Sequence, residues 1–126
     1  MKMPIILPLL FFTWTAHATF NEFECKFNTR SSGLVEIEID RAGEPDSMRT
    51  ATLLVNRERP REFQVTGKYN KTTRKMSFWG QNFDLEIQIW PHISPKFGRT
   101  YRADFKTNVL PEGPNFLNVT CRYYGY

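Results

Sequence analysis

The sequence predicts one small all-β domain, a single antiparallel β-barrel or two-sheet sandwich of about eight strands. Apolar and charged residues alternate with a period of two along most of the chain, as they do in a strand with one buried face. Clusters of Gly, Pro, Asn, Asp and Ser separate the alternating segments. No segment keeps the 3.6-residue period of an amphipathic helix, so little or no helix is expected.

The first five expected strands each offer an apolar face to a core. Residues 22–27 and 35–40 alternate Phe, Cys, Val or Ile with Glu, Lys or Asp. Residues 50–56 are apolar on both faces near their middle. Residues 62–66 and 75–79 are shorter, and each has two apolar side chains that are expected to point inward.

The last three expected strands are 82–90, 100–107 and 116–124. Along residues 82–90, four apolar residues alternate with Asp, Glu and Gln, which is the clearest strand pattern in the chain. Eight short strands with one apolar face each need a shared closed core. The turn-forming segments between the strands are 28–33, 41–47, 56–60, 70–73, 80–81, 91–98 and 108–115.

The chain has two cysteines, Cys25 and Cys121, on the first and last expected strands. Both fall on the inward face, and in an oxidising compartment they are expected to form a disulfide. A bridge between terminal strands indicates that these strands are neighbours, as they are in a closed barrel. A sandwich can also bring its terminal strands together, so both architectures stay open.

The N-terminus predicts export from the cytosol. Lys2 precedes the apolar run 4–14, and Ala16 and Ala18 stand where signal peptidase requires small residues. The run is too short to cross a bilayer, which takes about 20 apolar residues. We therefore expect residues 1–18 to be a cleaved signal peptide and residues 19–126 to form the single β domain, soluble in the periplasm or outside the cell.

The sequence contains few residues that are suited to catalysis. After residue 18 the only histidine is His92, in a proline-flanked loop where a solvated side chain is the simplest expectation. No nucleophile, metal or phosphate motif is present, and the strand carboxylates alternate with inward apolar residues, so they should face water. The sequence predicts a protein that is not an enzyme and has no cofactor and no metal.

Basic residues gather in the hairpin 67–75, which contains no acidic residue. Such a tip could contact an anionic surface, an envelope polymer or a protein. The alternative is a solvated hairpin that keeps the protein soluble. We do not expect nucleic acid as a partner, because an exported protein seldom meets it and the aromatic residues here are few. The candidate binding residues of this hairpin are Lys68, Tyr69, Lys71, Arg74 and Lys75.

Several aromatic residues fall on the outward face of the period-two pattern. Trp79 and Trp90 are the main examples, and Tyr124 is a third. Trp90 also begins a long loop that carries His92, Ile93 and Phe97. Exposed aromatic residues often anchor binding to sugars or proteins. Alternatively, these rings cap the ends of the barrel, or a bulge shifts the alternation by one residue.

These patterns predict an exported, non-catalytic binding protein that acts through the loop 90–98, Trp79, and the basic hairpin. A small-ligand carrier with a pocket inside the barrel is the first alternative, although many inward aromatic rings favour a filled interior. An enzyme and a structural envelope protein are lower alternatives. The target and the oligomeric state have no signature in the sequence.

Overall fold

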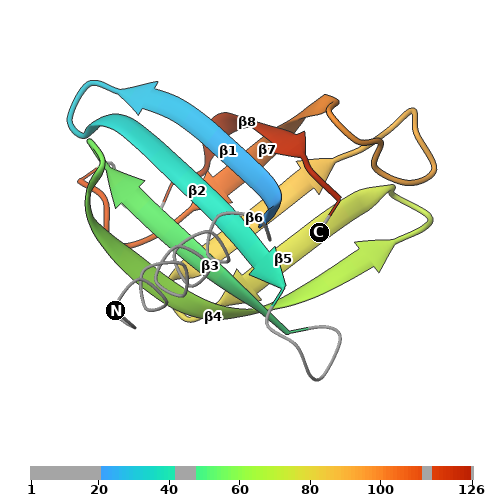
Figure 1. The fold of residues 1–126 in the computed structure, drawn as a ribbon, viewed down its shortest axis with the longest axis horizontal. Helices are drawn as coiled ribbons and strands as arrows, with labels where there is room; N and C mark the ends of the chain where they lie inside the picture. The colour runs from blue at the N-terminus through green and yellow to red at the C-terminus, as the bar shows by residue number, and fades with distance from the viewer. Residues whose placement is uncertain (1–20, 42–47, 112–114, 126) are drawn as a thin grey trace, which may run out of the picture.

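The alternating segments form eight antiparallel strands that close into a barrel in the computed structural model (Figure 1). The structure describes residues 21–41, 48–111 and 115–125. The expected signal peptide, residues 1–18, lies outside these ranges. Within them there is no helix long and apolar enough to cross a membrane. The strands are β1 (Asn21–Thr29), β2 (Gly33–Arg41), β3 (Met48–Val55), β4 (Glu58–Asn70), β5 (Lys75–Gly80), β6 (Phe83–Gln88), β7 (Thr100–Lys106) and β8 (Leu117–Tyr123).

Each strand pairs with the next one in the sequence, and β8 returns to pair with β1. This last pairing makes the fold a barrel and excludes the sandwich. Cys25 and Cys121 stand directly opposite each other in the β1–β8 ladder, and their sulfur atoms are bonded at 2.07 Å. The expected disulfide is therefore confirmed, and it joins the first and last strands where the barrel closes.

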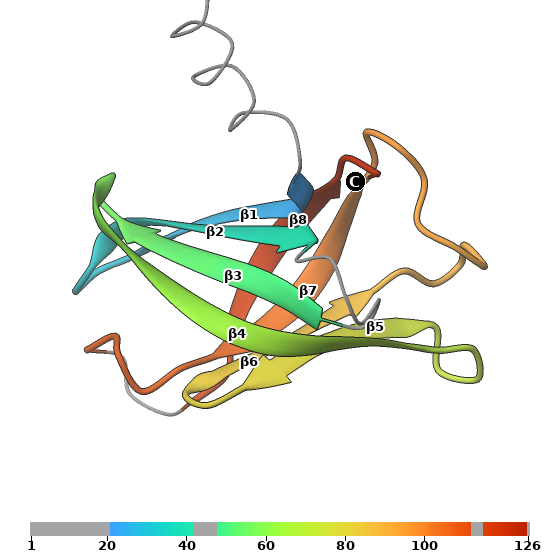
Figure 2. The ribbon, with the colours of Figure 1, turned by 60° about the horizontal axis from the view of Figure 1, so that its bottom comes forward.

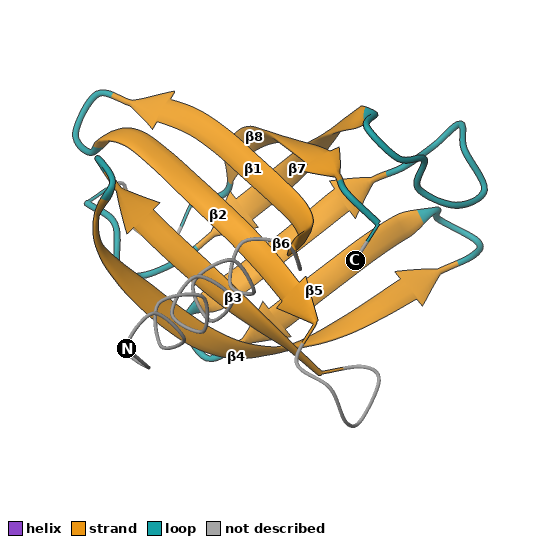
Figure 3. Cartoon of the chain, in the orientation of Figure 1, coloured by secondary structure: helices purple, strands orange, loops and turns teal. Residues whose placement is uncertain are grey.

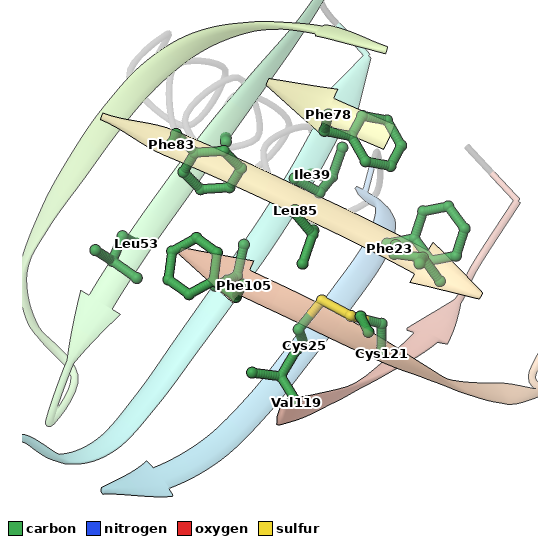
Figure 4. Close-up of a cluster of buried hydrophobic side chains, with 14 of the residues drawn as sticks. Phe23, Cys25, Ile39, Leu53, Phe78, Phe83, Leu85, Phe105, Val119 and Cys121 are labelled. Carbon is green, nitrogen blue, oxygen red and sulfur yellow. A yellow bond between two sulfur atoms is a disulfide. The ribbon is translucent and has the colours of Figure 1, made fainter. Parts of the chain in front are cut away.

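The inward side chains are large and contact one another across the barrel (Figure 4). The rings of Phe83 and Phe105 have centroids 5.0 Å apart, and those of Phe23 and Phe78 lie 5.9 Å apart. Such edge-to-face pairs add to the stability that apolar burial supplies. These four side chains belong to a buried core to which all eight strands contribute.

The largest difference from the sequence-based boundaries is β4, which was expected over 62–66 and spans 13 residues. Asn56 and Arg57 both have positive φ, at 54° and 59°, as the central residues of a tight two-residue hairpin do. The expected break at 56–60 thus shrinks to two residues. Pro60 fits because it lies within a bulge of the β3–β4 ladder, where Arg59 and Pro60 together face Leu54 and a missing N–H matters less.

The strand also continues through Gly67, one residue beyond its expected end at residue 66. A Cβ atom at this position would lie 2.9 Å from the ring of Phe78, so the absent side chain makes room for the core ring. Beyond Gly67, β4 pairs with β5 as far as Asn70. The basic hairpin is therefore an extension of the barrel wall and not a loose loop.

The connections between strands lie at two opposite ends of the barrel (Figure 3). At the end that we name the loop end are the turn 71–74, the loop 89–99 and the last residues of the chain after β8. At the other end, the turn end, are the turns 30–32, 56–57 and 81–82 and the described residues between β7 and β8. Residues 42–47 and 112–114, within two expected breaks, lie outside the described residues.

Candidate functional site

The loop between β6 and β7 carries three large apolar side chains in contact with solvent. Trp90 is 64% exposed, and Ile93 and Phe97 are each 74% exposed. Single exposed apolar residues are common, but several on one short loop are typical of a binding surface. Trp90 was expected to face outward, and the structure places it there.

The loop is held from inside the barrel by Tyr101. The ring of Tyr101 is only 6% exposed, and its hydroxyl accepts the backbone N–H of Lys96 at 2.9 Å. The same hydroxyl lies 2.7 Å from Nδ1 of His92. His92 is therefore half-buried and bonded to a core residue, which corrects the expectation of a solvated loop histidine. A tyrosine whose hydroxyl reaches the surface connects core and loop in this way.

The loop is also held by the basic hairpin. Tyr69 donates its hydroxyl hydrogen to the carbonyl oxygen of Ile93, and Nη1 of Arg74 donates to the carbonyl oxygen of Pro91 at 2.9 Å. The carbonyl of Arg74 in turn accepts the N–H of Ile89 at 3.0 Å. Two segments that the sequence proposed separately therefore form one surface. We call residues 67–75 and 89–99 together the loop–hairpin surface.

A third attachment joins the far side of the loop to the end of β8. The N–H of Gly98 donates to the carbonyl of Tyr123 at 2.8 Å, and the N–H of Tyr123 donates to the carbonyl of Arg99 at 3.0 Å. The loop is thus fastened at its start, middle and end. Its apolar side chains are presented by a fixed scaffold, which lowers the entropy lost when a partner binds.

Positive charge surrounds the apolar residues of this surface. Lys68 and Lys71 are exposed on the hairpin, and Lys96 and Arg99 are exposed on the loop. Neither segment of the loop–hairpin surface contains an acidic residue. Lys75 contributes less, because its Nζ lies 3.8 Å from the carboxylate of Glu86 on β6. The surface therefore combines apolar side chains with a net positive field.

The structure assigns different roles to the residues that the sequence proposed. Trp90, Phe97, Lys68 and Lys71 lie on the loop–hairpin surface with their side chains exposed. Tyr69, Arg74 and His92 lie on the same surface, but their side chains hold the β6–β7 loop in position through hydrogen bonds. The sequence analysis did not select Lys96, Arg99 or Tyr101, since a basic residue in a loop and a Tyr at an inward strand position are both commonplace.

Trp79 is not part of this surface. It lies near the end of β5, opposite Asp84 of β6, and therefore at the turn end of the barrel. It is 41% exposed and lines a shallow groove with Asp84 and Lys106. Burial and then the neighbouring carboxylate of Glu86 raise the pKa of Asp84, while Lys106 opposes this shift. Phe116 is 49% exposed nearby, with the Lys106 ammonium 4.8 Å from its ring centroid.

A buried ion pair lies near the loop end of the barrel. Nε of Arg49 on β3 lies 2.6 Å from the carboxylate of Glu22 on β1, and both side chains are less than a tenth exposed. The pair joins two strands that are not neighbours in the sheet, because β2 runs between them. The pair links β1 to β3, and it does not face solvent as a catalytic acid–base pair would. Within the described ranges, no three His, Cys, Asp or Glu side chains gather as a metal site would need.

Comparison of the chain with protein-family models, with curated proteins and with solved structures found no match.

Proposed function

We propose that this protein is an exported, non-catalytic binding module that acts through the loop–hairpin surface. One observation carries the proposal: Trp90, Ile93 and Phe97 stay exposed on a loop that is fastened to the barrel at three places. Apolar side chains that stay outside the core do not contribute the favourable free energy of burial unless a partner covers them. The disulfide supports a protein that works outside the reducing cytosol.

Two features support a binding surface over the alternatives that the sequence left open. The central Phe rings contact each other at 5 to 6 Å, which favours a filled interior over a pocket for a carried ligand. The imidazole of His92 is engaged by Tyr101 and serves the architecture of the loop. Both observations support a protein that acts through its outer surface.

The proposal can be tested by photo-crosslinking in the cell that produces the protein. The photoreactive residue p-benzoylphenylalanine would replace Phe97 in one variant and Phe116, at the opposite end, in a matched control. We expect adducts at position 97 and few at position 116, since both positions are exposed but only the first lies on the loop–hairpin surface. Equal labelling at both positions, or no adduct at position 97, would contradict the proposal.

A further inference from the structure

We infer that the partner of the loop–hairpin surface is an anionic phospholipid bilayer, on which the loop tip inserts its apolar side chains. This inference rests on the proposed function and names its target. It is carried by three features of the surface: the identity of the exposed apolar residues, the basic residues near them, and the hydrogen bonds that fix the loop between them.

The exposed residues are of the kinds that enter a bilayer surface. Trp90 combines a large apolar ring with an N–H donor, which suits the boundary between headgroups and acyl chains. Ile93 and Phe97 are purely apolar and are the most exposed large hydrophobic side chains among the described residues. Their transfer from water into the acyl region is favourable, because it removes apolar surface from water.

The basic residues lie where they would meet lipid phosphates. The hairpin supplies Lys68 and Lys71, and the loop supplies Lys96 and Arg99. Each Lys or Arg near an anionic leaflet adds an attraction that falls off within a Debye length. Both segments project beyond the barrel on one side, so one flat surface can meet them together (Figure 2).

Part of the loop backbone already has its hydrogen-bonding groups paired within the protein. In a medium of low polarity, an unpaired N–H or C=O group is costly. Pro91 and Pro95 have no N–H, and the carbonyls of Pro91 and Ile93 already accept side-chain hydrogen bonds. The N–H groups of His92 and Lys96 are bonded within the protein as well. These paired groups lower the cost of bringing that part of the loop into the interfacial region.

A convex tip also fits a bilayer better than a protein. Protein interfaces depend on close shape complementarity over a broad area. A bilayer accepts a projecting apolar tip without a matching hollow and supplies negative charge around it. A protein partner is therefore treated as an outcome of the test and not as a second proposal.

The test uses the oxidised chain of residues 19–126, which contains the whole described barrel, and phosphatidylcholine vesicles with and without phosphatidylglycerol. Trp79 and Trp90 are the only tryptophans in this chain, so each can be followed alone. In the Trp79→Phe variant, we expect a blue shift of Trp90 emission and quenching by brominated lipids in the anionic vesicles. In the matched Trp90→Phe variant, Trp79 should show neither effect, because it lies at the turn end.

Two further variants separate the apolar and the electrostatic contributions. Ile93→Ser with Phe97→Ser should lower the partition coefficient about tenfold or more, whereas Phe116→Ser should leave it unchanged. Lys71→Gln should lower it about fivefold on anionic vesicles and have little effect on neutral ones. Added salt should reduce binding to the anionic vesicles, since exposed charges are screened.

Failure of this inference is distinguishable from failure of the proposed function. No binding to anionic vesicles, or binding that the Ile93 and Phe97 substitutions leave intact, would overturn the bilayer as the target. If a protein is then captured at position 97 in the crosslinking experiment, the binding function stands and its partner is that protein. If vesicles and crosslinking both give nothing, the proposed function fails as well.

Discussion

The hydroxyl of Tyr101 lies 2.7 Å from Nδ1 of His92 and accepts the N–H of Lys96 at 2.9 Å. Because the oxygen accepts the Lys96 hydrogen, the hydroxyl hydrogen can be donated to the imidazole. One buried ring of β7 thus holds two positions of the β6–β7 loop from within the core. The path of the exposed loop depends on a residue that no partner would touch.

Tyr101→Phe should loosen the loop while leaving the barrel closed. The phenyl ring keeps its place in the core, but both hydrogen bonds to the loop are lost. We expect the free energy of unfolding to fall by about 1–2 kcal/mol. The Lys96 amide should exchange its hydrogen faster, whereas the amides of β2 should be little affected. Unchanged protection of Lys96 would show that Tyr101 does not hold the loop.

Removal of the disulfide should weaken the closure between β1 and β8. The bridge spans a sequence separation of 96 residues, so it restricts the unfolded chain strongly. We expect the double variant Cys25→Ala and Cys121→Ala to lose about 2–5 kcal/mol of stability in urea denaturation. Reductant should destabilise the unmodified protein to a similar extent and leave the variant unchanged. A loss below about 1 kcal/mol would mean that the β1–β8 ladder closes the barrel without help.

The ion pair between Glu22 and Arg49 should show strong coupling in a double-mutant cycle. Arg49→Met leaves the Glu22 carboxylate buried without its cationic partner, and we expect a loss of about 3–5 kcal/mol. Adding Glu22→Leu to that variant should recover most of this loss, because an apolar pair replaces a buried charge. The measurement is the urea midpoint of the two single variants and the double variant. Additive losses would show that the two groups do not interact across β2.

Glu38 should make the protein less stable as the pH rises through the range where carboxyl groups titrate. Its pKa is raised above 4.5, first by burial and then by three carboxylates of β1 and β2. A raised folded-state pKa means that the contribution to stability is present below pH 4.5 and is lost as the pH rises through the folded value. Glu38→Gln should therefore stabilise the protein at pH 7 by less than about 1 kcal/mol, with no gain at pH 4.

The control for this prediction is a substitution of Glu24, whose carboxylate faces Glu38 across the β1–β2 ladder. With Glu24→Gln in place, the effect of Glu38→Gln at pH 7 should shrink, since part of the repulsion is already gone. Urea denaturation at several pH values measures both. A stabilisation by Glu38→Gln that is the same at pH 4 and pH 7 would show that ionisation is not its cause.

The number, order and faces of the strands could be predicted because they depend on local alternation. Phe83, Leu85 and Ile87 are buried and their neighbours are not, as a period of two requires. The extent of β4 could not be predicted. Pro60 and Gly67 are turn signals in isolation, and only the bulge that contains the first and the Phe78 ring beside the second make them strand residues.

The amino-acid pattern alone was enough to predict an all-β fold, the positions of Cys25 and Cys121 on the terminal strands, and the outward orientation of Trp79 and Trp90. These properties follow from residue type and a two-residue period, which are local. The closure of the sheet as a barrel, the joining of the loop and the basic hairpin into one surface, and the place of Trp79 at the opposite end emerged only from the folded chain. The hairpin holds the loop through backbone carbonyls at positions 91 and 93, and every residue has a carbonyl, so no residue type marks such a contact in advance.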